Sequence, residues 1–256
     1  MSSYTIAEWA RILRDYKFWT SIILLIIINI ICVWEWLIPI NGITSVVRAI
    51  DYVIVGHTPY RSLIAPIITI VYVMSYHNEI NSTYKYLIIA RIGKNNYLKL
   101  KTIMCTLSAY SSMFISMLIF SLIVYFKAGA ITINGDEYLK NYACGELLTS
   151  YNPIIYILAI IAIYSMNAPV YAVFSLMMTN YTCDKYLIAL SPYLYIFLRE
   201  AIFDFLHIQP LCKSIFTATN IYKNPFVALS IMMLSTSSYI ALFGYIYIIR
   251  TRRNIA

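Results

Sequence analysis

The sequence predicts an all-α, polytopic membrane protein with six transmembrane helices in a single transmembrane domain over residues 1–256. Hydrophobic residues make up 61% of the chain and charged residues only 12%, whereas soluble domains carry about 25% charged residues. Several apolar runs approach the roughly 20 helical residues that cross a bilayer core of ~30 Å. The net charge of +8 comes from cations beside these runs, which favours anionic lipid headgroups and membrane topology over nucleic acid as its explanation.

Residues 1–17 predict an amphipathic helix that lies on the membrane surface ahead of the first span. Its charged residues occupy one side, and its apolar residues fall on the opposite helical arc. The charged residues are Glu8, Arg11, Arg14 and Asp15, and the apolar ones are Ile6, Trp9, Ala10, Ile12, Leu13 and Tyr16. The alternative interpretation is an ordinary charged flank of the first span.

The six spans are predicted at about 18–38, 58–76, 102–126, 153–178, 186–203 and 226–249. Pro66 lies inside the second span, and Pro192 lies inside the fifth, whose apolar run is short. Asn167 and Pro169 interrupt the middle of the fourth span. The segment 199–225 stays open between a helix end, an outer loop and a re-entrant element, since non-helical backbone at membrane depth needs cover from protein or a water-filled cavity.

The topology follows from the loops. Residues 39–61 and 127–152 are predicted as outer loops, because Gly and Pro interrupt the first and the second is acidic with an Asn-Gly turn. Lys and Arg are more frequent in the intervening segments and at the chain ends than in these loops. Both termini are therefore predicted on the cytoplasmic side.

The polar stretch 75–101 is the most informative part of the sequence. It holds five cations, which are Lys85, Arg91, Lys94, Lys99 and Lys101. Ile80, Tyr84, Leu87 and Ile88 recur at helical spacing, so a short amphipathic helix is predicted over Glu79–Ile92. Gly93 is expected to end that helix, and Asn95 or Asn96 to cap the next one near Tyr97.

The sequence contains no motif for covalent chemistry. A phosphate-binding G-x-x-x-x-G-K-[ST] loop, a G-x-S-x-G elbow and an H-E-x-x-H zinc helix are all absent from it. The five cysteines form no C-x-x-C pair and the three histidines are scattered, so no metal site is predicted. Cys144 and Cys212 are both predicted to face outward, where they are either two free thiols or a disulfide.

Three residues in the spans are candidates for a substrate path: Asn29, Asn167 and Pro192. An amide within a transmembrane bundle also serves in helix–helix hydrogen bonds. Both interpretations of the two asparagines stay open from the sequence.

The stretch 75–101 resembles a known family. Glu79, then Arg91-Ile92-Gly93-Lys94, then Tyr97-Leu98-x-x-Lys101 resembles the E…R-x-G-[SR]…Y-L-x-x-K pattern of bacterial type-2 ABC exporter permeases. The order of parts is most similar to the small permeases of Gram-positive peptide and lantibiotic systems. The layout covers the whole chain, and the residue-level match covers about 75–101.

The resemblance implies a transport subunit that is not itself an enzyme. It implies that Glu79–Ile92 is a cytoplasmic coupling helix that docks on a separate ABC ATPase subunit, which binds ATP and Mg, and that residues 1–17 are the elbow helix. The residues implied in coupling are Glu79, Tyr84, Lys85, Leu87, Ile88, Arg91, Gly93, Lys94 and Lys101. The permease is expected to act as a homodimer or with a paired permease.

The resemblance also implies a location and a substrate class. The expected location is the bacterial plasma membrane. The expected solute is an amphipathic or antimicrobial peptide, or a lipid-like molecule, because few charges are available for a polar solute.

Two other classes of function stay open. A secondary transporter fits the division into three plus three spans, with a proline in the second span of each half. Against it, no Asp or Glu is predicted at mid-span to couple an ion. A non-transporting membrane sensor or assembly partner is the third hypothesis, in which the patterned helix has no coupling role.

Overall fold

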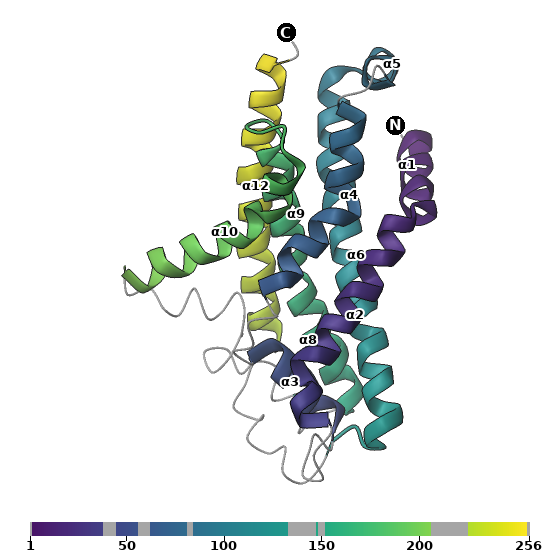
Figure 1. The fold of residues 1–256 in the computed structure, drawn as a ribbon, viewed down its shortest axis with the longest axis vertical. Coiled ribbons are helices and arrows are strands. Elements are labelled where there is room, and N and C mark those ends of the chain that lie inside the picture. Colours follow the sequence, from purple (N-terminus) through teal and green to yellow (C-terminus); the bar gives the residue numbers. More distant parts are fainter. Residues whose placement is uncertain are drawn as a thin grey trace.

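The computed structural model describes residues 2–37, 45–55, 62–80, 84–132, 147, 152–205 and 225–254, and these residues form an all-helical bundle (Figure 1). No strand occurs among them. The helices are α1 Ser2–Arg14, α2 Tyr16–Leu37, α3 Val46–Val55, α4 Ile64–Ile80, α5 Tyr84–Ile92, α6 Lys94–Ala128, α8 Pro153–Ser165, α9 Asn167–Met178, α10 Lys185–Phe205 and α12 Pro225–Asn254.

Four helical stretches within the described residues are long and apolar enough to cross a membrane. They are Tyr16–Trp34, Lys94–Ala128, Pro153–Met178 and Ser230–Arg252. These stretches overlap the predicted first, third, fourth and sixth spans, so the prediction of a membrane protein with these four candidate spans is confirmed. α4 has 17 residues, and the apolar part of α10 ends at Leu198; both are shorter than the roughly 20 residues of a complete crossing.

The helix that corresponds to the predicted second span is displaced toward the C-terminus. The prediction was 58–76, whereas α4 covers Ile64–Ile80; residues 58–61 lie outside the described residues. The predicted fifth span, 186–203, falls on α10, which continues through Pro192 as one helix. Residues 199–205 of the ambiguous segment belong to α10, and residues 206–224 are not described. Figure 1 shows α10 leaving the bundle at a steep angle to α9 and α12.

The prediction that residues 39–61 form only a loop was wrong, because α3 lies inside this segment. Ser45 caps α3, and its hydroxyl accepts a hydrogen bond from the Arg48 amide at 3.2 Å. The amides of Val46 and Val47 donate to the carbonyls of Ala130 and Ile131, both at 3.2 Å. These bonds satisfy amides that the helix itself leaves unpaired. The partners lie beyond the end of α6, so a local sequence window does not show them.

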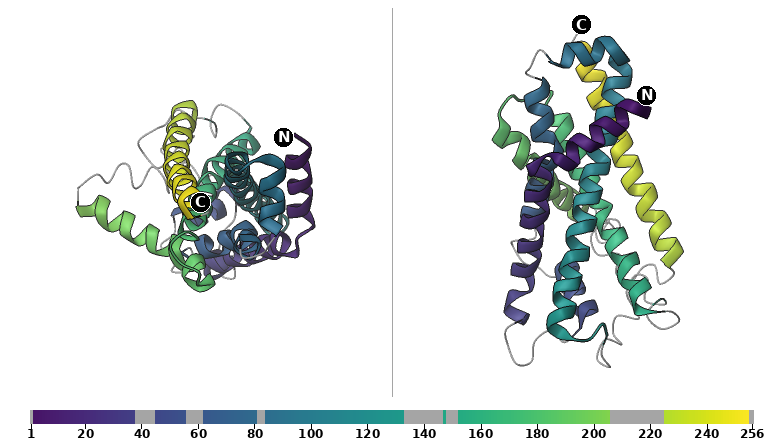
Figure 2. Two further views of the ribbon diagram at one scale, coloured as in Figure 1. Left: turned by 90° about the horizontal axis from the view of Figure 1, so that it is seen from above. Right: turned by 90° about the vertical axis from the view of Figure 1, so that its right-hand side faces the viewer.

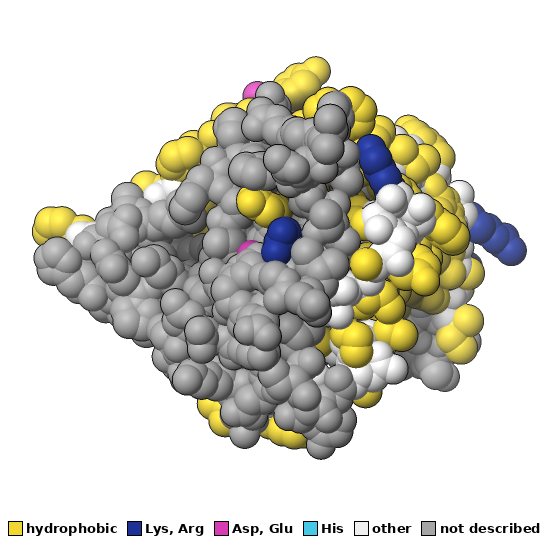
Figure 3. All heavy atoms as spheres, turned by 90° about the horizontal axis from the view of Figure 1, so that it is seen from below, with side chains coloured by type: hydrophobic (Ala, Val, Ile, Leu, Met, Phe, Trp, Pro, Cys, Tyr) yellow, Lys and Arg dark blue, Asp and Glu magenta, His cyan; other side chains and the backbone are white. Residues whose placement is uncertain are grey.

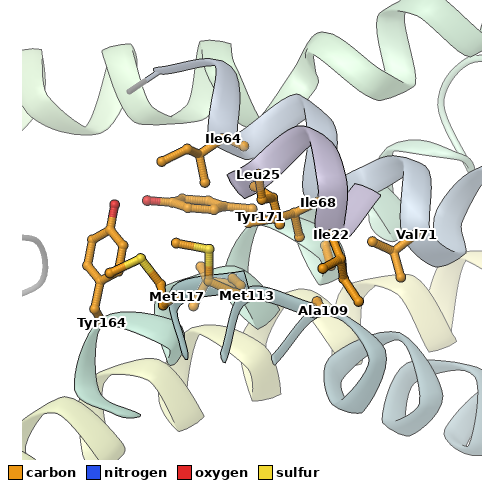
Figure 4. Close-up of a cluster of buried hydrophobic side chains, with 14 of the residues drawn as sticks. Ile22, Leu25, Ile64, Ile68, Val71, Ala109, Met113, Met117, Tyr164 and Tyr171 are labelled. Carbon is orange, nitrogen blue, oxygen red and sulfur yellow. The ribbon is translucent and has the colours of Figure 1, made fainter. Parts of the chain in front are cut away.

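The core lies where α2, α4, α6 and α9 meet. Figure 4 shows Ile22 and Leu25 of α2 against Ile68 and Val71 of α4. The other labelled members are Ile64, Ala109, Met113, Met117, Tyr164 and Tyr171. Bulky aliphatic side chains on α2 and α4 pack against smaller and more flexible ones on α6, which is how close-packed interiors fill irregular space.

The predicted interruption of the fourth span is present as a break between α8 and α9 at Met166. Pro169 has no N–H, so it cannot complete the helical hydrogen bond to the carbonyl four residues earlier. Asn167 lies directly at the break, and its Nδ2 donates to the Tyr164 carbonyl at 3.1 Å. The Asn167 side chain thus adds a hydrogen bond to the backbone at the break.

Candidate functional site

The candidate site lies at the end of the bundle where α1 crosses α4 and α6, close to α5 (Figure 2). It consists of a group of charged and phenolic side chains, all buried except that of Arg11, which is 42% exposed, and of the short helix α5. We call this group of side chains the charge cluster. Its members are Glu8 and Arg11 of α1, Tyr72 and Glu79 of α4, and Tyr97 and Lys101 of α6.

Lys101 lies at the centre of the charge cluster and is completely buried. Its Nζ donates to Glu8 Oε1 and to Glu79 Oε2, each at 2.7 Å. The guanidinium of Arg11 donates to Glu79 Oε2 at 3.0 Å and to Glu8 Oε1 at 2.7 Å. Two carboxylates and two cations therefore balance one another, as buried charges require.

Two tyrosine hydroxyls complete the hydrogen bonding of the carboxylates. Tyr72 Oη donates to Glu8 Oε1 at 2.9 Å, and Tyr97 Oη donates to Glu79 Oε1 at 2.8 Å. The Lys101 ammonium also lies 5.3 Å from the centroid of the Tyr97 ring, within the range of a cation–π interaction. The network joins three helices that are far apart in the sequence.

The electrostatics of the charge cluster favour the ionised state of Glu79. Burial by itself raises the pKa of this carboxyl, but Lys101, Tyr97 and Arg11 together outweigh burial and lower its pKa below the ordinary value of 4.5. The pKa of Arg11 is raised, since the attraction of Glu8 and Glu79 outweighs the opposing effect of its burial. Both groups are therefore charged at neutral pH.

α1 is the separate N-terminal helix that the sequence predicts, but its charged side contacts protein. Glu8 is only 4% exposed, whereas Ile6 is 69% exposed. The two predicted faces do not separate cleanly, because Ile12 is only 4% exposed while Arg14 is exposed. The prediction also missed the protein partners of Glu8 and Arg11, which lie more than sixty residues away in the sequence.

The prediction of one helix over Glu79–Ile92 was wrong. Glu79 belongs to the last turn of α4, and α5 covers Tyr84–Ile92; residues 81–83 lie outside the described residues. Glu79 and Lys101, which the family resemblance implied as coupling residues, lie inside the charge cluster and are buried. Their charges are paired with other charged residues of the same chain.

Two of the remaining predicted coupling residues lie on the exposed side of α5. They are Leu87, which is 62% exposed, and Arg91, whereas Ile88 is buried. Tyr86, which was not among the predicted coupling residues, is 59% exposed. Lys85 is half-buried, and nothing is described of the Tyr84 side chain. The helical spacing predicted Leu87 and Ile88 on one face; the structure separates them, with Ile88 anchoring α5 and Leu87 facing outward.

Gly93 ends α5 as predicted, with a φ of 80° that glycine adopts without the strain of a side chain. The prediction for the next helix was late, because α6 begins at Lys94. Asn96 lies inside the first turn of α6, and its Nδ2 donates back to the Ile92 carbonyl at 3.0 Å. Asn95 and Asn96 are therefore not caps. A single non-helical residue separates α5 from α6.

A second polar network attaches the end of α12 to the same region. The hydroxyls of Tyr76 and Tyr247 share a hydrogen bond between α4 and α12. Asn180 donates to the Tyr247 carbonyl at 3.3 Å and accepts from the Thr251 hydroxyl at 2.9 Å. Lys94 Nζ donates to the Arg252 carbonyl at 2.8 Å. No local pattern in the sequence predicts these contacts, because each joins segments that lie far apart in the chain.

The candidates for a substrate path occupy three different settings. Asn29 is completely buried, and its Nδ2 lies 3.3 Å from Met117 Sδ across the α2–α6 contact. Asn167 bonds to backbone within its own helix pair, as described above. Pro192 is buried in α10, where the Ser191 hydroxyl donates at 2.8 Å to the Ile188 carbonyl that the proline leaves free. Asn29 Oδ1 is buried without a hydrogen-bond partner among the described residues, and the substrate path stays a prediction for all three residues.

The structure describes only some of the residues on which the cysteine and metal predictions depend. Cys144 and Cys212 lie outside the described residues, and Cys183 is an exposed thiol. Among the residues that the structure describes, no group of three or more His, Cys, Asp or Glu side chains is placed to hold a metal ion.

No protein-family model matches the chain, and comparison with curated proteins and with solved structures gives no match. A functional assignment therefore has to rest on the residues and the geometry of this chain.

Proposed function

We propose that this chain is the membrane-spanning permease subunit of a type-2 ABC exporter in the bacterial plasma membrane. ATP hydrolysis takes place on a separate cytoplasmic ATPase subunit, and two permease chains, identical or paired, act together. Both termini face the cytoplasm. The solute is an amphipathic or antimicrobial peptide, or a lipid-like molecule.

The observation that carries the proposal is α5. It is a short helix between α4 and α6, it lies at one tip of the bundle in both views (Figures 1 and 2), and it exposes Tyr86 and Leu87 there. Exposed aromatic and aliphatic side chains at the centre of a polar surface are typical of protein-binding sites. A helix in this position can be displaced by a soluble protein that binds to it.

The charge cluster supports a mechanical role for this end of the bundle. α4 and α6 flank α5 in the chain, and the cluster ties both of them to α1 through Lys101 and Glu79. Displacement of α5 would then move α1, α4 and α6 as one unit. ATP-driven closure of the partner would shift the bundle between inward-open and outward-open states.

Six spans follow if α4 and α10 also cross the membrane. α4 is preceded by a helical turn at residues 62–63, which lengthens its helical stretch. α10 has 21 residues and continues past its apolar part. The apolar interior of the bundle supports the choice of an amphipathic solute over a strongly polar one.

Purification of the tagged chain in mild detergent from its native host tests the proposal. We expect a stoichiometric ATPase subunit with a Walker A motif to co-purify. Leu87→Ala on α5 should lower its recovery, while Leu187→Ala, which also removes an exposed leucine (52% exposed) but on α10, should not.

A different outcome would identify the competing functions. A chain that purifies alone and moves solute in vesicles without ATP is a secondary transporter. A chain that binds the ATPase, yet neither stimulates hydrolysis nor moves solute, is a sensor or assembly subunit.

A further inference from the structure

The tip of the bundle that carries α5 also carries a basic surface contributed by α5, the start of α6 and the end of α12. We define the basic surface as Lys85, Arg91, Lys94, Lys99, Arg250 and Arg252, all of them half-buried or exposed. Within residues 84–101, 179–185 and 247–252, the single carboxylate is that of Asp184. The acids of α1 and α4 nearest to this end, Glu8 and Glu79, are already paired in the charge cluster. The basic surface is therefore largely unneutralised.

Direct contacts hold together the start of α6, the end of α12 and the turn between α9 and α10. Lys94 of α6 donates to the Arg252 carbonyl of α12. The guanidinium carbon of Arg250 lies 4.5 Å from the centroid of the Tyr181 ring in the turn between α9 and α10. Asn180 of the same turn bonds to the backbone of α12. The end of α12 is thus fixed beside the start of α6, only one residue after α5.

The expected position of this surface relative to the membrane favours protein over lipid as its partner. α5 and the C-terminal end of α12 lie at the same tip, beyond α1, in both side views (Figures 1 and 2). If the third span begins at residue 102, as the sequence predicts, eight helical residues, about 12 Å at 1.5 Å per residue, separate Lys94 from the apolar region. α1, with Ile6 exposed, is the helix suited to the membrane surface.

The structure describes part of the surface at the opposite end of the molecule. Viewed from below, the described side chains there are mostly hydrophobic, with scattered Lys, Arg and acidic side chains (Figure 3). The described residues of the α5 end, in contrast, include the six cations of the basic surface.

We propose that α5 and the end of α12 form one docking surface for the same soluble protein, and that the matching face of this protein is acidic with an apolar centre. The inference rests on the proposed function, which makes this protein the ATPase subunit. Leu87 and Tyr86 supply the apolar contact, and Arg252 and Arg91 supply the charge complementarity that steers and orients docking.

Site-specific photo-crosslinking in the native host tests this inference. A photoreactive amino acid is placed at Leu87, at Arg252 and, as a control for the membrane surface, at Ile6. We expect positions 87 and 252 to crosslink to the same Walker A-containing protein, identified by mass spectrometry, and position 6 to give no such product.

Charge variants supply the second measurement. Arg252→Glu should lower the yield of the crosslink from position 87 by about tenfold, as loss of a steering charge does, and Arg252→Lys should retain it. The Arg252 carbonyl that accepts from Lys94 is unchanged in both variants, and equal elution on size exclusion verifies that both fold. The remaining yield should fall with added salt.

The outcomes separate this inference from the function on which it rests. If position 87 crosslinks the ATPase while position 252 crosslinks only lipid or another protein, the shared docking surface is wrong and the proposed function stands. An unchanged yield with Arg252→Glu also overturns the inference. If neither position crosslinks an ATPase, the proposed function fails as well.

Discussion

Residues 79–101 contain charges in two opposite environments. Glu79 and Lys101, at the ends of the stretch, are buried and bonded to each other and to α1. Arg91 and Lys94, near its middle, lie on the outer surface of the bundle tip. Residues that belong to one sequence pattern therefore have two different roles. Arg91 and Lys94 form part of the outer surface, and Glu79 and Lys101 hold together the helices that carry this surface.

The largest expected effect comes from Lys101→Met. It leaves Glu8 and Glu79 with only Arg11 as a counter-charge, and removal of one partner from a buried ion pair costs about 3–5 kcal/mol. The free energy of unfolding in detergent measures the loss. Lys99→Met is the matched control, because this lysine is exposed, and we expect a change within about 0.5 kcal/mol. Equal effects of the two variants would contradict the central role of Lys101.

Low pH should weaken the ion pairs of the buried Glu79 and leave the outer charges of Arg91 and Lys94 unchanged. The folded-state pKa of Glu79 lies below its ordinary value of 4.5. Its contribution to stability is therefore complete above that ordinary value and is lost as the pH falls through the lowered folded-state value. Unfolding measured from pH 7 to pH 3 should show a steeper acid loss for the wild type than for Glu79→Gln. Parallel curves would show that Glu79 is not the group responsible.

A smaller effect is expected from the tyrosine pair that joins α4 to α12. Tyr76→Phe removes the hydrogen bond to Tyr247, and a bond of this kind contributes about 0.5–1.5 kcal/mol. A double-mutant cycle with Tyr247→Phe isolates the contribution of the pair. Additive effects of the two substitutions would mean that the hydroxyls do not stabilise each other.

The smallest effect on stability belongs to Arg91→Gln. Its side chain is exposed, so the free energy of unfolding should change by no more than about 0.5 kcal/mol. Recovery of the co-purified ATPase should nevertheless fall, since the substitution removes a charge from the basic surface. A destabilised Arg91→Gln variant with normal ATPase recovery would contradict this assignment. Arg91 would then stabilise the fold, as Lys101 does, and not the docking of the ATPase.

The parts of the fold that sequence predicts well are those determined locally. Hydropathy found α2, α6, the α8–α9 pair and α12, and Gly93 marked the end of α5. Local periodicity also found α1 as a separate helix. It did not find what Glu8 contacts, because Glu8 and Lys101 are separated by 93 residues.

The candidate site was predicted only in part, because Glu8, Arg11 and Tyr72 of the charge cluster were not among the predicted coupling residues. The pattern selected Glu79, Arg91 and Lys101 together, but only the packing of α1 against α4 and α6 divides them into buried and exposed groups. α3 was missed for a similar reason, since its first amides bond to carbonyls beyond α6. In each case the decisive partner comes from a distant segment.

The charge cluster also has a consequence for the order in which the chain is made. Glu8 precedes its buried partner Lys101 by 93 residues and is therefore synthesised before it. Until Lys101 is present, the Glu8 carboxylate lacks the central cation of the charge cluster, and a charge without its partner stays hydrated. α1 is therefore translated before α6 but can complete its packing only after α6 has been synthesised.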